Sequence, residues 1–218
     1  MGLSRRWVAT PLLFVLIWAA CGSCGGNSTS LSATTQLRDA AKATAQAPSF
    51  TLSVAGAEVT YQAPDRVEQV ERGQASSASG GSGGPGTSSG PYPETITKIF
   101  IAERYYEAQT RSGQMPAFHV AQRCPSDQNA ADDVLAILRA IATAAVAESS
   151  NGTYTFTITK PPAASVPMNG TATLSGGFVR SLSVGTGTGQ PAVTISAVGT
   201  APPVTAPASS TPMSYSCG

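Results

Sequence analysis

Between residues 49 and 72 the chain reads SFTLSVAGAEVTYQAPDRVEQVER. Apolar side chains recur in this stretch, with Ser, Thr, Glu or other polar residues between most of them. They are Phe50, Leu52, Val54, Val59, Tyr61, Val67 and Val70. Such alternation is typical of strands with one buried and one solvated face, and Gly56 marks a tight turn between the first two segments. The stretch therefore predicts antiparallel strands joined by short turns.

The alternation returns further along the chain. It predicts strands over 94–103, 104–109 and 117–123, and three more around Tyr154 to Ile158, Phe178 to Val184 and Val193 to Ile195. An Ala-rich segment from Ala33 to Ala47, ending before a proline, predicts a first helix.

A second helix follows Cys124. Apolar residues cover one broad face of it, at Val134, Leu135, Ile137, Leu138 and Ile141. We expect Pro125-Ser126-Asp127 to cap this helix, with Asp132 and Asp133 favourably placed near its N-terminus. We expect it to run to about Ser149, before the turn signal Asn151-Gly152. The order of helices and strands predicts an α+β fold, in which one curled antiparallel sheet holds helices against its concave side.

The first twenty residues have the parts of a secretory signal. Arg5 and Arg6 form a positive n-region, an apolar run begins at Trp7, and small residues precede Cys21. The run is shorter than the about 20 residues that span a bilayer, so we interpret 1–20 as a removable signal peptide. The paired arginines fit twin-arginine export as well as general secretion, and we favour general secretion.

Residues 18–21, Trp-Ala-Ala-Cys, resemble the lipobox of bacterial lipoproteins, with Trp18 where Leu or Val is usual. In lipoproteins the cysteine receives a diacylglycerol and becomes the new N-terminus. We therefore expect lipidation of Cys21 and a chain tethered to the cell membrane on its extracytoplasmic side. The alternative is an ordinary signal-peptidase cut, for instance after Gly22.

The mature chain is nearly neutral. Two of the 13 basic residues leave with the signal, so 11 basic side chains face 12 acidic ones. With no basic cluster, the sequence predicts no nucleic-acid partner. We expect a flexible tether at 21–32, one folded domain at 33–200, a disordered Gly- and Ser-rich insertion at 73–93, and a Pro-, Ala- and Ser-rich tail at 201–218.

Three cysteines remain besides Cys21. Cys24 lies in the tether, which leaves Cys124 and Cys217 as the plausible disulfide pair in an oxidising compartment. Within the fold there is no CxxC or other metal-ligand spacing, and the Gly-rich run from Gly80 to Gly86 lacks the lysine and the flanking strand and helix of a phosphate loop, so we expect no metal and no cofactor.

The sequence predicts no enzyme. His119 is the single histidine, and we interpret it as an outward or half-buried strand residue, with Phe118 and Val120 on the opposite face. The sequence has no Walker phosphate loop and no HExxH motif.

Two stretches carry a resemblance to a known family. Phe50 to Val54 with Val59 to Val67, and Ile99-Phe100-Ile101-Ala102-Glu103-Arg104-Tyr105-Tyr106, are similar to strands of LolA/LolB-type carriers, closest in style to the actinobacterial LppX/LprG lipoproteins. The order of elements fits over most of 33–200. The resemblance implies an unclosed antiparallel half-barrel around helices, with a hydrophobic cavity that carries or senses a lipid or glycolipid.

On this interpretation a ligand would lie between sheet and helices. The residues expected to line the cavity are Leu52, Val54, Val59, Tyr61, Ile99, Ile101, Val134, Leu135, Leu138, Ile141, Tyr154, Phe156, Ile158, Leu182, Val193 and Ile195. The same apolar residues would equally well fill a close-packed core without a cavity. The competing hypothesis is therefore an envelope regulatory or protein-interaction module without a cavity, whose protein partners the sequence does not identify.

Overall fold

A computed structural model describes residues 32–54, 56–75, 92–127, 129–162, 166–185, 192–214 and 217. They belong to one compact unit, Leu31–Gly218. The helices are α1 (Ala33–Ala45) and α2 (Ala130–Ala144). The strands are β1 (Ser49–Val54), β2 (Ala57–Gln62), β3 (Arg66–Ala75), β4 (Tyr92–Ile101), β5 (Arg104–Arg111), β6 (His119–Gln122), β7 (Ala145–Ser150), β8 (Thr153–Ile158), β9 (Met168–Ser175), β10 (Phe178–Gly185), β11 (Val193–Ser196) and β12 (Thr211–Pro212).

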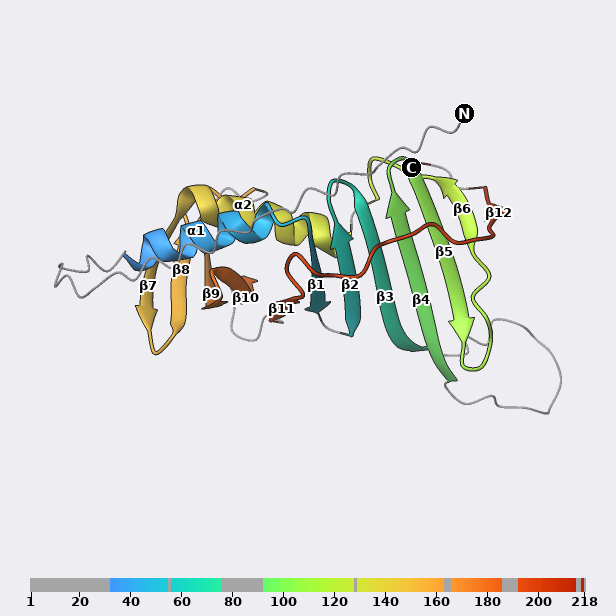
Figure 1. Cartoon of the computed structure of the whole chain (residues 1–218), viewed down its shortest axis with the longest axis horizontal. Coiled ribbons are helices and arrows are strands. Elements are labelled where there is room, and N and C mark those ends of the chain that lie inside the picture. Colours follow the sequence, from blue (N-terminus) through green and yellow to red (C-terminus); the bar gives the residue numbers. More distant parts are fainter. Residues whose placement is uncertain are drawn as a thin grey trace, which may run out of the picture. The chain divides into compact units, whose positions relative to one another are not determined.

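All described strands form one sheet, in the order β12-β6-β5-β4-β3-β2-β1-β11-β10-β9-β8-β7. Neighbouring strands are antiparallel except for β12, which runs parallel to β6. Because β12 and β7 are the two outer strands, the sheet is not closed into a barrel. Both helices pack on it, with α1 against β7 and β10 and α2 against β2, β7 and β8 (Figure 1). The predicted α+β fold, a curled and unclosed sheet around helices, is confirmed.

The helices begin at side-chain caps. Ser32 accepts a hydrogen bond from the Thr35 backbone N–H at 3.2 Å, and Asn129 accepts one from the Asp132 N–H at 3.0 Å. The predicted cap of α2 at Pro125-Ser126-Asp127 is therefore wrong. The Asp127 carboxylate instead accepts the Cys124 N–H at 2.7 Å, which closes a turn ahead of the helix.

The predicted C-terminus of the second helix is also wrong. The helix ends at Ala144, and Ala145–Ser150 forms β7, an antiparallel hairpin with β8. Asn151 and Gly152 both have positive φ, at 52° and 77°, as the two-residue turn of a tight hairpin requires. Asn-Gly thus connects two strands, because its twist matches that of a hairpin.

Besides β7, three strands differ from the sequence expectation. The strand predicted over 117–123 is the shorter β6, while β9 and β12 were not predicted. The ends of the predicted 73–93 insertion extend β3 and β4, where Gly73 pairs with Glu94 and Ala75 with Tyr92. Residues 76–91 lie outside the described part.

The outer edge of β7 is covered by side chains of α1. The Thr34 hydroxyl donates to the Ala147 carbonyl at 3.1 Å and accepts from the Ala147 N–H at 2.9 Å. The Arg38 Nε donates to the Ala145 carbonyl at 2.8 Å. These contacts satisfy backbone groups that an uncovered edge strand would offer to another chain.

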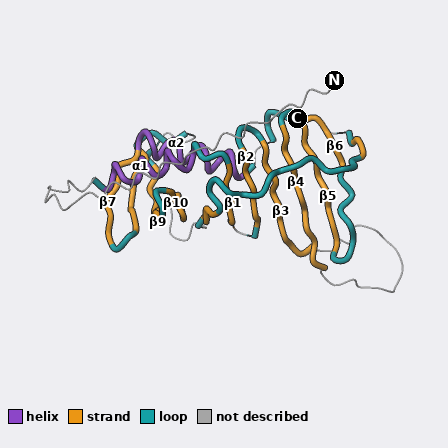
Figure 2. The backbone as a smooth tube through the Cα atoms, in the orientation of Figure 1, coloured by secondary structure: helices purple, strands orange, loops and turns teal. Residues whose placement is uncertain are grey.

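The C-terminal tail crosses the side of the sheet that faces away from the helices. In Figure 2 it runs as a loop from β11 across β2 to β5 and reaches β12 beside β6. Val204 anchors it: its N–H donates to Gln62 at 3.2 Å, its carbonyl accepts from Arg66 at 3.3 Å, and its side chain is fully buried. The Cys124–Cys217 disulfide fastens the end of the tail, as predicted.

Candidate functional site

Most of the predicted cavity residues share the helix-facing side of the sheet. Register brings them together: Leu52 lies opposite both Val59 and Ile195. One buried cluster contains Leu52, Val59, Tyr61, Val134, Leu135, Leu138, Ile141, Tyr154, Phe156, Ile158, Leu182 and Ile195, and Val193 packs against it partly buried. Strands far apart in sequence thus present one apolar surface to α1 and α2.

Three predicted residues lie elsewhere. Ile99 belongs to a second buried cluster with Tyr106 and Val204, and Ile101 packs against that cluster. Phe100, between the two isoleucines, faces the helices, so alternation turns Ile99 and Ile101 toward the tail. Val54 is half-buried at the end of β1. The structure therefore separates Ile99 and Ile101 from the helix-facing group.

The apolar interior is filled by the chain's own side chains. Leu138 and Ile141 of α2 have no exposed surface, and the Phe50 and Tyr61 rings stack at 4.7 Å between centroids. Gly170 of β9 leaves room for the Phe156 ring, since a Cβ there would lie 2.6 Å from the ring's Cζ. A ligand entering between α2 and the sheet must therefore move these groups apart.

Beyond β2 the helix-facing side carries polar residues as well as the apolar Val67, Phe100 and Tyr105. On β3, Gln69 and Glu71 follow Val67 on the same side, and Lys98 and Glu107 lie across from them on β4 and β5. The Gln69 amide donates to Glu71 at 2.6 Å, and the Lys98 ammonium contacts the same carboxylate at 3.1 Å. The Tyr105 hydroxyl contacts Glu107. This polar strip was not predicted, although its residues share the alternation of Val67 and Phe100.

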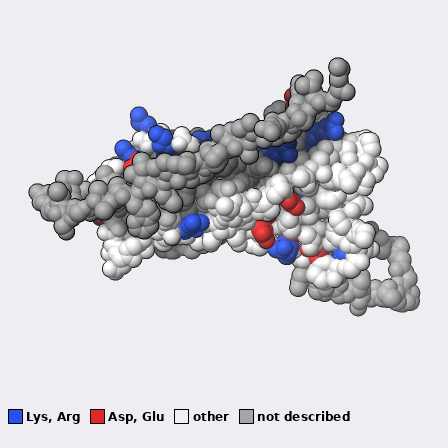
Figure 3. All heavy atoms as spheres, viewed as in Figure 1, with Lys and Arg blue, Asp and Glu red and all other residues white. Residues whose placement is uncertain are grey.

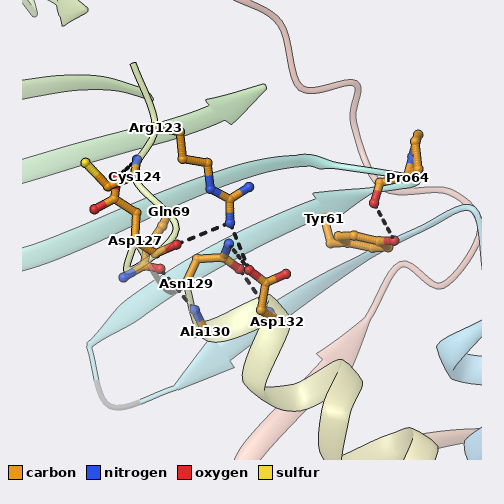
Figure 4. Close-up of polar contacts among 9 residues, drawn as sticks. All are labelled: Tyr61, Pro64, Gln69, Arg123, Cys124, Asp127, Asn129, Ala130 and Asp132. Carbon is orange, nitrogen blue, oxygen red and sulfur yellow. Dashed lines mark hydrogen bonds and ion pairs between the residues drawn. The ribbon is translucent and has the colours of Figure 1, made fainter. Parts of the chain in front are cut away.

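The N-terminus of α2 meets this strip. The Ala130 N–H donates to the Gln69 side-chain oxygen at 3.4 Å. Arg123 donates to the Asp132 carboxylate at 3.0 Å and lies over the Phe100 ring, 5.1 Å from its centroid. Figure 4 shows the hydrogen bonds of Gln69 and Arg123 meeting at the first turn of α2. A few polar contacts therefore hold this end of the helix to β3 and to the loop after β6.

Burial raises the pKa of the Tyr61 hydroxyl above its ordinary value, which Arg139 opposes by charge attraction. The hydroxyl donates to the Pro64 carbonyl at 3.4 Å (Figure 4). Tyr61 therefore presents its ring to the apolar cluster as a neutral group.

Three surface hollows lie around the interior. One of about 360 Å³ is lined by Gly56, Ala57, Glu71, Arg72, Gly73, Glu94 and Ile96. A second, of about 480 Å³, lies between α1 and the β9–β10 turn and includes Gln36, Ala40, Tyr154 and Gly177. A third, of about 520 Å³, lies beside β6 and Met213. None of these three is lined by the apolar face of α2, but the first opens beside Glu71, at the polar end of the helix-facing side.

The remaining sequence predictions concern the histidine, metal sites and membrane attachment. His119 is exposed on β6, with Val120 and Phe118 partly buried in the second cluster, as expected. Within the described ranges, no group of three or more His, Cys, Asp and Glu side chains is arranged to hold a metal ion. Neither described helix is long and apolar enough to cross a membrane. Cys21, Cys24 and the signal peptide lie outside the described residues.

Comparisons with known proteins give a distant structural likeness. No family model matches the chain, and no curated protein matches it. Among solved structures the chain is similar to the crystal structure of LprF from Mycobacterium bovis, with 13% sequence identity and a TM-score of 0.44. The match covers 81% of this chain and 97% of that chain. What the protein does must therefore be argued from its own side chains.

Proposed function

We propose that the chain is a membrane-anchored envelope lipoprotein that binds a lipidic ligand between the sheet and its two helices. The acyl part would lie against the apolar face of α2, and the polar part toward Gln69, Glu71 and Lys98. The anchor would be the lipid on Cys21.

One observation carries this proposal. A single side of one sheet is apolar where the helices cover it and becomes amide-bearing and charged at β3, just past the N-terminus of α2. An amphiphile has the same division into apolar and polar parts. Each CH₂ group removed from water contributes about 0.8 kcal/mol, so a long chain could be held without any catalytic group.

The filled interior implies an opening step. Such a step would begin at the polar contacts at the start of α2, because the hydrogen bond that Gln69 accepts and the one that Arg123 donates can be replaced by hydrogen bonds to water. The resemblance of residues 50–67 to LolA/LolB-type carriers supports the same proposal.

The filled interior also favours a second candidate, an envelope interaction module without a ligand. The Leu138→Trp variant separates the two. In a permanently closed core the added volume overpacks and should cost about 1–3 kcal/mol of unfolding free energy. In an interior that opens for ligand, the indole occupies ligand space, so the unfolding free energy should change by less than about 1 kcal/mol while bound lipid falls several-fold.

Chemical denaturation and lipid content should be measured on the same preparation. Ile99→Trp is the matched control, because it places the same ring on the side of the sheet that faces away from the helices. It should lower stability and leave lipid content unchanged. A Leu138→Trp protein that loses stability but retains its lipid would refute the proposed location.

A further inference from the structure

Four basic residues lie on or beside the two helices. They are Arg38 and Lys42 on α1, Arg139 on α2 and Lys160 in the loop after β8. Lys42, Arg139 and Lys160 are exposed, and Arg38 is half-buried. We refer to these four residues as the basic surface.

Hydrogen bonds place two of the four residues, Arg38 and Lys160, at the carboxyl end of α2. The Arg38 side chain donates to the Ala145 carbonyl, and the Thr159 N–H, next to Lys160, donates to the Ala144 carbonyl at 3.2 Å. The start of α1 and the end of α2 both meet β7, so the helices run antiparallel, and Lys42 and Arg139 lie back along the pair from this end. In Figure 3, Lys and Arg side chains gather over α1 and α2.

Charge is unevenly distributed between the two ends of α2. Asp39 and Glu148 are the acidic residues on α1 and β7, the elements that carry or adjoin the basic surface. The other end of α2 begins with Asp132 and Asp133 and follows Asp127. Arg123 pairs with Asp132 at that end, so three acidic residues stand beside one basic residue. An anionic surface would therefore attract the end with Arg38 and Lys160 more strongly.

The chain enters the fold at the same end. Ser32 caps α1, and Thr34, two residues on, bonds to β7. Residues 22–31, between Cys21 and this cap, can span at most about 35 Å when fully extended. A lipid on Cys21 would thus hold the start of α1 within that distance of a membrane.

We propose that the basic surface lies against an anionic bilayer and orients the protein on it. This inference rests on the proposed lipid anchor, but not on the proposed cargo. Each Lys or Arg near an anionic surface strengthens binding by roughly fivefold, so four residues suffice to select one orientation of a tethered domain. The opposite end, with the start of α2 and the polar strip, then faces away from the membrane.

The three lysines of the chain allow a direct test. Lys42 and Lys160 belong to the basic surface, whereas Lys98 lies on β4 in contact with Glu71. Full-length protein that carries the lipid on Cys21 is reconstituted into vesicles of phosphatidylcholine alone or with one third phosphatidylglycerol. Each lysine is then labelled with an amine-reactive reagent, and the labelling rate is measured by mass spectrometry. We expect Lys42 and Lys160 to react at least fivefold more slowly in the anionic vesicles, with Lys98 unchanged, and high salt to remove the difference.

Two variants and one control complete the test. Arg139→Gln should weaken the protection of both lysines, and Arg104→Gln, the same change on β5, should not. Equal rates in both kinds of vesicle, or selective protection of Lys98, would overturn the inference. Flotation with phosphatidylcholine vesicles tests the anchor separately, because Cys21→Ala should abolish flotation. The content of bound lipid tests the proposed cargo.

Discussion

At the scale of single residues, Gly170 shows how closely the interior is packed. A Cβ at this position would lie 2.5 Å from the Ser183 carbonyl oxygen and 2.6 Å from the Phe156 ring. Real Cβ atoms do not approach so closely, so the backbone of β9 and β10 or the ring must shift.

Gly170→Ala should therefore destabilise the fold by about 1–3 kcal/mol, the usual cost of overpacking. Urea denaturation monitored by circular dichroism measures this cost. Gly73→Ala is the matched control, because a Cβ there meets nothing within 4 Å and alanine removes some unfolded-state entropy. If both variants had equal stability, the space beside Phe156 would be larger than the structure shows.

Residue-level prediction of the buried side of each strand succeeded where apolar and polar residues alternate strictly. Leu52, Val59 and Phe156 alternate with polar neighbours, so their side of the strand could be read directly. Ile99-Phe100-Ile101 is apolar on both sides, and the sequence alone does not say which side faces the helices. The answer depends on the tail, whose Val204 covers Ile99 from about 100 residues further along the chain.

At the scale of elements, the boundary between α2 and β7 was the main error. The segment Ala145-Val146-Ala147-Glu148 continues an Ala-rich helix by propensity, but Ala145 and Ala147 are buried while Val146 and Glu148 are exposed, the pattern of a strand. The hydrogen-bonded pairing with β8 stabilises the strand over the helix in this segment. The unpredicted β9 has a similar cause, since Gly170 and Ala172 provide too little side chain to reveal a buried face.

The tail is the element whose attachment is easiest to test. Cys217→Ser removes the bond to Cys124, across 93 residues of sequence. We expect a loss of about 2–4 kcal/mol in unfolding free energy, because closing so long a loop limits the unfolded chain. Hydrogen exchange should also rise at Ile99 and Tyr106, which the tail buries through Val204.

Ser214→Ala, an exposed change in the same tail, should alter neither quantity. Unchanged exchange at Ile99 in the Cys217→Ser protein would mean that β12 pairing and Val204 hold the tail without the disulfide.

At the scale of the whole molecule, both sides of one sheet are covered by other parts of the chain. The helices cover the apolar part of one side, and the tail covers the Ile99–Tyr106 patch on the other. The α+β class and the curled sheet followed from the long alternating segments of the sequence. That the sheet is unclosed was implied by the resemblance to LolA/LolB-type carriers. The division of the helix-facing side into apolar and polar parts required strand register, which depends on contacts between distant segments.

The central claim is that a lipidic ligand occupies the space between sheet and helices. The most direct measurement is native mass spectrometry of the full-length protein, purified from its own membrane without detergent exchange. The account predicts a species heavier than the acylated chain, which loses an apolar molecule on collisional activation and no longer contains it after denaturation. A spectrum with the acylated chain alone, in protein that has never been exposed to competing detergent, would contradict the account.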